Sequence, residues 1–264
     1  MKFFIMICVF LCSSLGAKIV EVSNFEEILN HITPDSTILC DIDDTILIPS
    51  QMVRCDEWFC AMLQRYKDEG LSPKEALQES LDRWEMVRHV TEMQLVEPVT
   101  ASIIQQMQEK GLCVMGLTTQ GFSLERRTIW QLEGNGVLLH KTAPSEEDVY
   151  FTRDSKGEKQ GVLFRKGILF TGGAHKGESF FTLCEKVGHE PKHIVFINDK
   201  GTHLKEIKES ANKRGIDFIG LRYAYSDATK ARFDMEVAEA QFARIPHKKI
   251  ISDEEAVEHL LLVK

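Results

Sequence analysis

Two aspartates that could do chemistry follow an apolar run directly. Residues 37–40 read Thr-Ile-Leu-Cys, and Asp41 and Asp43 come next. Residues two apart on an extended chain point their side chains the same way, so these carboxylates should lie close together. They repel each other unless a cation joins them, and a hard cation such as Mg²⁺ prefers oxygen ligands. With the metal bound, Asp41 could attack phosphorus as a nucleophile, and Asp43 could act as general acid and then general base.

The alternative for this segment is an Asp-rich turn in which Asp43 or Asp44 caps a helix. The apolar run before Asp41 and the threonine at Thr45 favour the reactive site over that turn.

Polar residues also end two other apolar runs. Residues 114–117 lead to Thr118, whose hydroxyl could donate to a phosphoryl oxygen or could cap the next helix. Thr119 is its neighbour and could exchange roles with it. Residues 194–197 lead to Asn198 and then Asp199, which adds a carboxylate suited to a metal ion.

Lys176 stands at the predicted start of a helix, where a positive charge opposes the helix dipole. This placement predicts an anionic neighbour. The glycines nearby suggest a P-loop, but that motif needs Ser or Thr after Gly-Lys, and Gly177 and Glu178 follow Lys176 instead. No His-Glu-x-x-His pair and no Gly-x-Ser-x-Gly elbow is present.

Strand-like apolar runs alternate with amphipathic helical runs, which predicts an α/β fold with a parallel sheet covered on both faces. The predicted strands are 18–22, 37–40, 114–117, 194–197 and 218–221. The predicted helices are 23–31, begun by a capping box of Ser23 and Glu26, then 98–110, 123–133, 176–187, 203–213, 226–243 and 253–262. Ligands of such sheets bind beyond the carboxyl ends of the strands, where Asp41, Thr118 and Asp199 stand.

Two stretches interrupt this alternation. Residues 51–97 contain no good strand and read as two or three helices, so we expect a helical cap over 49–97 inserted into a core of 18–48 and 98–264. Residues 148–170 predict a small hairpin flap, with strands at 149–152 and 161–164.

The sequence resembles the haloacid dehalogenase superfamily. Residues 38–45 match its first motif, an apolar strand followed by Asp-x-Asp-x-Thr, and the segments ending at Thr118, Lys176 and Asp199 match the other three in order. The matches extend over about residues 36–205. The resemblance implies a Rossmann-like core with a small helical cap. The fourth motif departs from the usual pattern, in which a second acid is adjacent or lies four to five residues later. Here Asn198 precedes Asp199, and Lys200 and His203 follow, so the second polar contact stays open; the amide oxygen of Asn198 could provide it.

The same resemblance implies a Mg²⁺-dependent phosphatase that works through an aspartyl-phosphate. Asp41 would be the nucleophile and Asp43 the general acid and base, while Thr118 and Lys176 would hold the phosphoryl oxygens. Mg²⁺ would be bound by Asp41, the backbone carbonyl of Asp43 and Asp199. Two alternatives stay open: a phosphotransferase or mutase that uses the same nucleophile, and a secreted binding or host-interaction protein with this fold but no turnover.

Composition limits the partners. The 264 residues carry a formal charge of −8 and a pI of about 5.6, which disfavours nucleic acid as a partner. The expected substrate, a phosphorylated small molecule, is implied by the resemblance. Residues 1–17 read as a signal peptide, with a buried first strand as the alternative. We therefore expect export to the periplasm or beyond, with no stable membrane span after signal removal. An exported chain of this kind also resembles an uncharacterised family of secreted proteins from bacteria that live inside host cells.

The cysteines do not suggest a disulfide framework. Cleavage at residue 17 would leave an odd number of them, five, in a long chain. Cys55 and Cys60 are close enough in sequence to pair, and the sequence leaves that pairing open.

Overall fold

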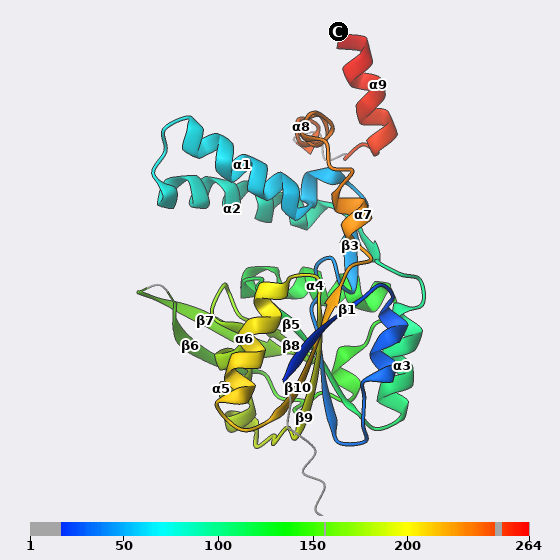
Figure 1. Ribbon diagram of the computed structural model, residues 1–264. Helices are drawn as coiled ribbons and strands as arrows, with labels where there is room; N and C mark the ends of the chain where they lie inside the picture. The colour runs from blue at the N-terminus through cyan, green and yellow to red at the C-terminus, as the bar shows by residue number, and fades with distance from the viewer. Residues whose placement is uncertain (1–16, 156, 246–249, 264) are drawn as a thin grey trace, which may run out of the picture.

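A mostly parallel eight-stranded sheet forms the centre of the protein in the computed structural model, which describes residues 17–155, 157–245 and 250–263 (Figure 1). Its strands are β1 (Lys18–Val22), β2 (Ser36–Cys40), β5 (Cys113–Thr118), β6 (Val149–Ser155), β7 (Glu158–Arg165), β8 (Ile168–Phe170), β9 (His193–Asn198) and β10 (Asp217–Tyr223). The spatial order is β1-β10-β9-β2-β5-β8-β7-β6. Pairing is parallel from β1 to β8 and antiparallel for β7 and β6. The predicted α/β fold is confirmed.

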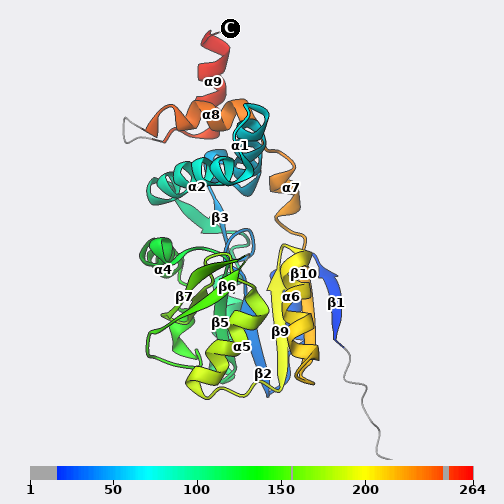
Figure 2. The same cartoon turned by 90° about the vertical axis from the view of Figure 1, so that its left-hand side faces the viewer.

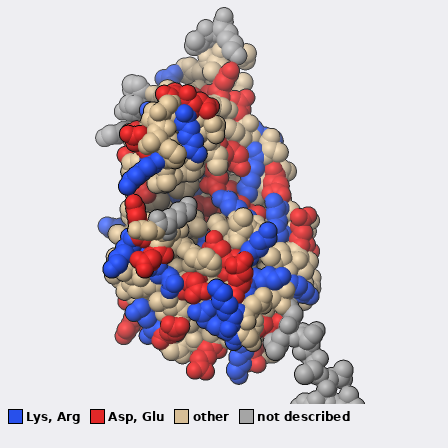
Figure 3. Space-filling view, turned by 60° about the vertical axis from the view of Figure 1, so that its left-hand side comes forward, with Lys and Arg blue, Asp and Glu red and all other residues tan. Residues whose placement is uncertain are grey.

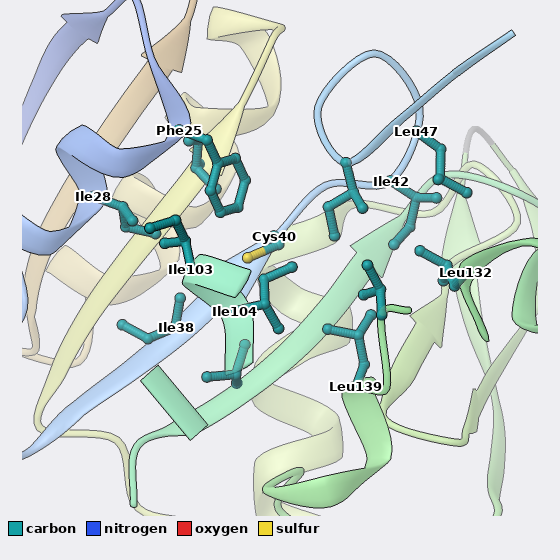
Figure 4. Close-up of a cluster of buried hydrophobic side chains, with 14 of the residues drawn as sticks. Phe25, Ile28, Ile38, Cys40, Ile42, Leu47, Ile103, Ile104, Leu132 and Leu139 are labelled. Carbon is teal, nitrogen blue, oxygen red and sulfur yellow. The ribbon is translucent and has the colours of Figure 1, made fainter. Parts of the chain in front are cut away.

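Helices cover both faces of the sheet. The 3₁₀ helix η1 (Phe25–Asn30) and α3 (Thr100–Glu109) lie on one face, and α5 (Lys176–Val187) and α6 (Gly201–Asn212) lie on the other (Figures 1 and 2). Side chains of a strand alternate between faces, so Ile38 and Cys40 join the cluster under η1 and α3, whereas Leu39 joins the opposite cluster. Figure 4 shows part of the first cluster. Burial on both faces explains why β2 has no exposed position.

Beyond one end of the sheet lies a helical layer built from the predicted insert. It contains the 3₁₀ helix η2 (Met52–Arg54), α1 (Asp56–Asp68) and α2 (Pro73–Val90) (Figures 1 and 2). Ser72 caps α2 by accepting a hydrogen bond from the Glu75 amide, and Pro73 occupies the first helical turn. We call this layer, residues 49–97 as expected from the sequence, the cap.

Helix α8 (Met235–Phe242), in the last part of the chain, packs against the cap. The rings of Trp58 and Phe242 lie 5.3 Å apart, and the Trp58 indole N–H donates to Glu239 at 3.1 Å. The Gln241 side chain accepts from the Val53 amide at 3.0 Å. These contacts join a late helix of the chain to the cap. The division into core and cap domains stays a prediction.

Short strands were missed by sequence reasoning. Residues 51–97 were expected to hold no strand, but β4 (Met93–Leu95) pairs antiparallel with β3 (Leu47–Pro49) at the base of the cap. Strand β8 was also not predicted. Each of these strands has three residues, which is too short to show an alternating pattern.

Two predicted helices were wrong in detail. The helix expected over 226–243 is divided into α7 (Asp227–Lys230) and α8, because Asp234 is extended and its carboxylate caps α8 by accepting from two backbone amides. The capping box expected for Ser23 and Glu26 is displaced by one residue. The Glu27 carboxylate accepts from the amides of Ser23 and Asn24, and the turn that follows is 3₁₀ rather than α.

The remaining expectations fit the observed elements closely. Helix α4 (Glu125–Gly134) follows a 3₁₀ turn, η3 (Phe122–Leu124). A second 3₁₀ turn, η4 (Leu139–Lys141), precedes the hairpin, and α9 (Asp253–Val263) is the last helix of the described residues. The predicted hairpin is present as β6 and β7, but it forms the edge of the main sheet through β8 rather than a separate flap. Cys55 and Cys60 are free thiols.

The predicted signal peptide, residues 1–17, lies outside the described residues except at its last position. Among the described residues, no helix is both long and apolar enough to cross a membrane. On the face shown in Figure 3, basic and acidic side chains are interspersed rather than gathered by sign.

Candidate active site

The chain turns sharply after β2, and this turn places Asp41 at the sheet edge. The Asp41 amide donates to the Ile197 carbonyl at 3.0 Å, which continues the pairing of β2 with β9. The Ile42 carbonyl then accepts from the amides of residues 46 and 47, and Asp44 adopts a left-handed φ of 60°. Aspartate tolerates that conformation better than most residues. The turn leads into β3 and not into a helix, so the helix-capping alternative for Asp43 and Asp44 is wrong.

Lys176, the first residue of α5, contacts Asp41. Its ammonium donates to Asp41 Oδ1 at 2.7 Å and to the Leu117 carbonyl at 3.0 Å, and the Lys176 side chain is fully buried. This is the anionic neighbour that the position of Lys176 predicted. Burial raises the pKa of Asp41 to about 6 against the opposing effect of Lys176, and the charge of Asp199 raises it further. Lys176 therefore does not fully offset the effect of burial on the Asp41 carboxylate.

Asp199 follows β9 and is buried beside the same turn. Its amide donates to the Thr45 hydroxyl at 3.1 Å, and its Oδ2 accepts from the Lys230 ammonium at 2.5 Å. Lys230 lies on α7 and is also 3.9 Å from the Asp44 carboxylate. Within the described part of the chain, Asp199 Oδ1 is buried and has no hydrogen-bond partner. An orphaned carboxylate oxygen in the interior is costly, and a cation would satisfy it.

These residues fit a hard divalent cation. The charge of Asp199 adds to burial in raising the pKa of Asp41, and one oxygen of Asp199 is unsatisfied among the described residues. Oxygen donors of this kind suit Mg²⁺. In residues 17–155, 157–245 and 250–263, no group of three or more His, Cys, Asp or Glu side chains is arranged around one point. A metal here would therefore need a backbone oxygen, such as the carbonyl expected from Asp43.

The side chain of Asp43 points to a different set of partners, which the sequence did not predict. Arg88 Nη2 donates to both carboxylate oxygens at 2.8 and 2.9 Å, and Gln120 Nε2 donates at 2.8 Å. Arg54 lies 3.8 Å away, and the Thr128 hydroxyl holds the other end of Gln120 at 2.5 Å. Burial would raise the pKa of Asp43, but the two guanidinium groups outweigh it and hold that pKa well below its usual value.

Thr118 lies between these two sets of contacts. Its hydroxyl is buried and accepts from the Gln120 amide at 3.2 Å, which leaves its own proton to donate elsewhere. The preceding carbonyl, of Leu117, holds Lys176, and the Gln120 side chain holds Asp43. Thr119 is exposed, and its carbonyl accepts from the Gly173 amide at 3.1 Å.

The segment after β9 contacts the cap. The amide oxygen of Asn198 accepts from the Lys200 amide at 2.7 Å, so it is already engaged in the local turn. The Lys200 ammonium pairs with Asp56 at the start of α1, which links core and cap. Burial and two nearby lysines lower the pKa of His203 to about 2, so its ring is neutral.

Sequence reasoning therefore found the residues at the strand ends but missed Arg54, Arg88, Gln120 and Lys230. An arginine in the last turn of a helix, such as Arg88, is ordinary because it complements the helix dipole. Nothing in its local sequence distinguished it from a solvated residue.

A family model for proteins of unknown function, DUF2608, matches residues 21–257. The chain belongs to the DUF2608 family. It is 24% identical over 252 residues to a Chlamydia pneumoniae protein named "Putative outer membrane protein", covering 94% of this chain and 92% of that one. A Chlamydia muridarum protein of the same name is 22% identical over 256 residues, covering 96% and 94%. This DUF2608 chain is also 21% identical over 229 residues to an uncharacterized protein of Rickettsia prowazekii, covering 84% and 81%.

Proposed function

We propose that this protein is a Mg²⁺-dependent phosphomonoester hydrolase of the haloacid dehalogenase type, with Asp41 as its nucleophile. The observation that carries the proposal is the buried contact between Lys176 and Asp41 beside the unsatisfied carboxylate of Asp199. The proposed nucleophile, Asp41, thus lies at the sheet edge with a cation, Lys176, that offsets its charge. Asp199 adds a second carboxylate suited to binding the metal ion.

In the first step, an Asp41 carboxylate oxygen bonds to phosphorus and the bond from phosphorus to the ester oxygen breaks. Lys176 offsets negative charge as the dianionic phosphoryl group approaches, and the Thr118 hydroxyl donates to a phosphoryl oxygen. The leaving oxygen takes a proton from Asp43. In the second step, Asp43 takes a proton from water, whose oxygen bonds to phosphorus and releases Asp41 and inorganic phosphate.

The metal would be held by the carboxylates of Asp41 and Asp199 and by the Asp43 carbonyl. When bound, Mg²⁺ supplies positive charge to the nucleophile and to the phosphoryl oxygens.

The contacts of Asp43 favour its role as a base. Because Arg54 and Arg88 hold its pKa low, the carboxylate is ionised and ready to accept a proton from water. Donating a proton in the first step requires Asp43 to move away from Arg88 or to share the arginine with another anion.

Export is part of the proposal. It is supported by the leader-like residues 1–17 and by the relatives named as outer membrane proteins. The proposed location is outside the cytoplasmic membrane, and the proposed substrate is a phosphorylated small molecule.

The decisive experiment is hydrolysis of p-nitrophenyl phosphate by the purified protein with Mg²⁺. We expect turnover that EDTA removes and Mg²⁺ restores, and we expect Asp41→Asn to lower kcat by about four orders of magnitude or more. Asp35→Asn, an exposed aspartate remote from the site, is the matched control and should leave the rate unchanged. Equal rates in Asp41→Asn and the wild type would refute the nucleophile.

A second candidate is a secreted binding protein that retains this fold without turnover. The observation favouring it is the Lys230 ammonium on Asp199, which places a protein cation on a carboxylate expected to bind metal. No Mg²⁺-dependent hydrolysis of any aryl phosphate, together with no Mg²⁺ binding in calorimetry, would favour this candidate. A phosphotransferase differs only in its acceptor, and adding an alcohol acceptor to the same assay would reveal it.

A further inference from the structure

Two arginines are almost fully buried beside Asp43. Arg54 ends the 3₁₀ helix η2, and Arg88 lies in the last turn of α2, so both belong to the cap. Their side chains are 3% and 1% exposed. Charged groups are rarely buried to this extent without full pairing.

Their pairing is incomplete. Arg88 contacts Asp43 through Nη2 alone, and its Nε and Nη1 are buried with no hydrogen-bond partner among the described residues. Within the same described residues, Arg54 Nε is also buried and unpartnered, and the hydrogen-bond partner of Arg54 Nη1 is the Met93 sulfur, a weak acceptor. A buried donor without an acceptor loses its hydration and gains nothing in return, so each of these groups destabilises the site. Arginine usually meets an oxyanion through two parallel N–H donors, and here that fork is unfilled.

The nearby carboxylates do not balance this charge. Arg54 and Arg88 share Asp43, and although Arg54 also feels Asp44 and Asp56, those two carboxylates lie against lysines. Burial and the charge of Arg88 lower the pKa of Arg54 to about 9. The Arg88 guanidinium lies 4.0 Å over the Trp84 ring, which shields one of its faces from solvent. The two arginines thus share one carboxylate, that of Asp43, and the desolvated site retains excess positive charge.

We propose that Arg54 and Arg88 form a binding site for a second anionic group, a carboxylate or phosphate, on the leaving-group side of the substrate. This inference rests on the proposed function only for where the scissile phosphoryl group lies. Such a substrate is a phosphomonoester whose alcohol portion carries its own oxyanion.

The position of Asp43 fixes the side on which this anion binds. The phosphoryl group is assigned to Lys176 and Thr118 on the sheet edge, and Asp43 exchanges its proton with the leaving oxygen. Groups that contact Asp43 from the cap therefore face the leaving group rather than the phosphoryl group. In this arrangement, the cap selects the substrate by the charge of its second anionic group, while the core residues carry out phosphoryl transfer.

The test compares two phosphomonoesters that differ in one anionic group, 3-phosphoglycerate and glycerol 3-phosphate. Isothermal titration calorimetry on the wild-type protein in EDTA measures binding of both without turnover. We expect 3-phosphoglycerate to bind about tenfold tighter or more, as one charge-assisted contact predicts. Arg54→Met and Arg88→Met should reduce this ratio to about one.

Arg83→Met is the matched control. Arg83 lies on the same helix, α2, and contacts the rings of Tyr66 and Phe242 instead of Asp43. The preference should survive this change, because net charge alone does not produce it. Arg54→Lys and Arg88→Lys keep the charge but lose the fork, and they should lower the ratio even if the methionine variants fail to fold.

Three outcomes overturn the inference: equal affinities in the wild type, a preference unchanged in the Arg54 and Arg88 variants, or a preference lost equally in Arg83→Met. None of these depends on hydrolysis. If Asp41-dependent turnover of p-nitrophenyl phosphate holds but the preference is absent, the anion site fails and the proposed function stands. If the preference is present but Asp41-dependent turnover is absent, the anion site stands and the proposed function fails.

Discussion

The two halves of the candidate site have opposite imbalances of charge. On the sheet edge, carboxylates exceed their cations. The groups concerned are Asp41, Asp44 and Asp199 against Lys176 and Lys230. On the cap side, guanidinium groups exceed their carboxylate, with Arg54 and Arg88 against Asp43.

The pKa values show the same contrast. Burial and neighbouring charges raise the pKa of Asp41, whereas the cap arginines lower that of Asp43, although the two aspartates are two residues apart. Two aspartates so close in sequence thus differ in pKa because they have different tertiary neighbours. The contrast teaches that the core half carries excess negative charge and the cap half excess positive charge, an arrangement that the proposed metal ion and anionic substrate would complete.

The largest expected effect is that of removing Lys176. Lys176→Met leaves the Asp41 carboxylate buried with no cation, so we expect a loss of about 3 kcal/mol in the free energy of unfolding, measured by urea titration at pH 7.5. The double variant with Asp41→Asn should recover part of that loss, because the uncompensated charge is gone. Lys186→Met, on an exposed position of the same helix, should change stability by less than about 0.5 kcal/mol. Strictly additive effects of Lys176→Met and Asp41→Asn would contradict the coupling.

A smaller effect with opposite signs is expected from the two aspartates. Because the folded-state pKa of Asp41 is raised from 3.8 to about 6, its ionisation costs stability as pH rises through that window. In EDTA, the free energy of unfolding of Asp41→Asn should therefore exceed that of the wild type by about 1–3 kcal/mol at pH 7.5, and this difference should vanish near pH 4.

Asp43→Asn should do the reverse. The depressed pKa of Asp43 stabilises the fold above its unfolded value of 3.8, and this contribution is lost only as pH falls through the lower folded value. The variant should be less stable than the wild type at pH 7.5. Stability–pH curves for both variants check the contrast, and a shift of the same sign in both would remove it.

The smallest expected effect concerns Lys230. Its ammonium would compete with the proposed metal ion for Asp199, so Lys230→Met should tighten Mg²⁺ binding by about tenfold, equivalent to one charge-assisted contact. Calorimetric titration with MgCl₂ measures this directly. The control is Lys213→Met, at the end of α6 on an exposed position, which should leave the affinity unchanged. Weaker binding in Lys230→Met would show that the lysine supports the site instead of competing for it.

The core half of the site could be predicted because its residues follow buried strands. Parallel strands covered on both faces read as continuous apolar runs, and their carboxyl ends meet at one edge. That rule identified Asp41, Thr118 and Asp199. Lys176 was identified by the order of the four motifs along the chain and by its position at the start of a helix. The prediction required no knowledge of long-range contacts.

The cap half could not be predicted in the same way. Arg54 and Arg88 lie in helical segments where arginine is common, and only the folding of the cap over the sheet brings them to Asp43. Strands β3, β4 and β8 were missed because three residues carry no periodicity, and the division between α7 and α8 depends on the cap made by Asp234.

The sequence by itself determined the alternation of strands and helices and the identity of the groups at the strand ends, since local hydrophobic pattern records which segments are buried on both faces. The tertiary structure decided what each aspartate faces. Lys176 and Asp199 lie beside Asp41, and Arg54 and Arg88 lie beside Asp43, because charge pairing depends on distances between segments far apart in the chain, and no local pattern encodes those distances.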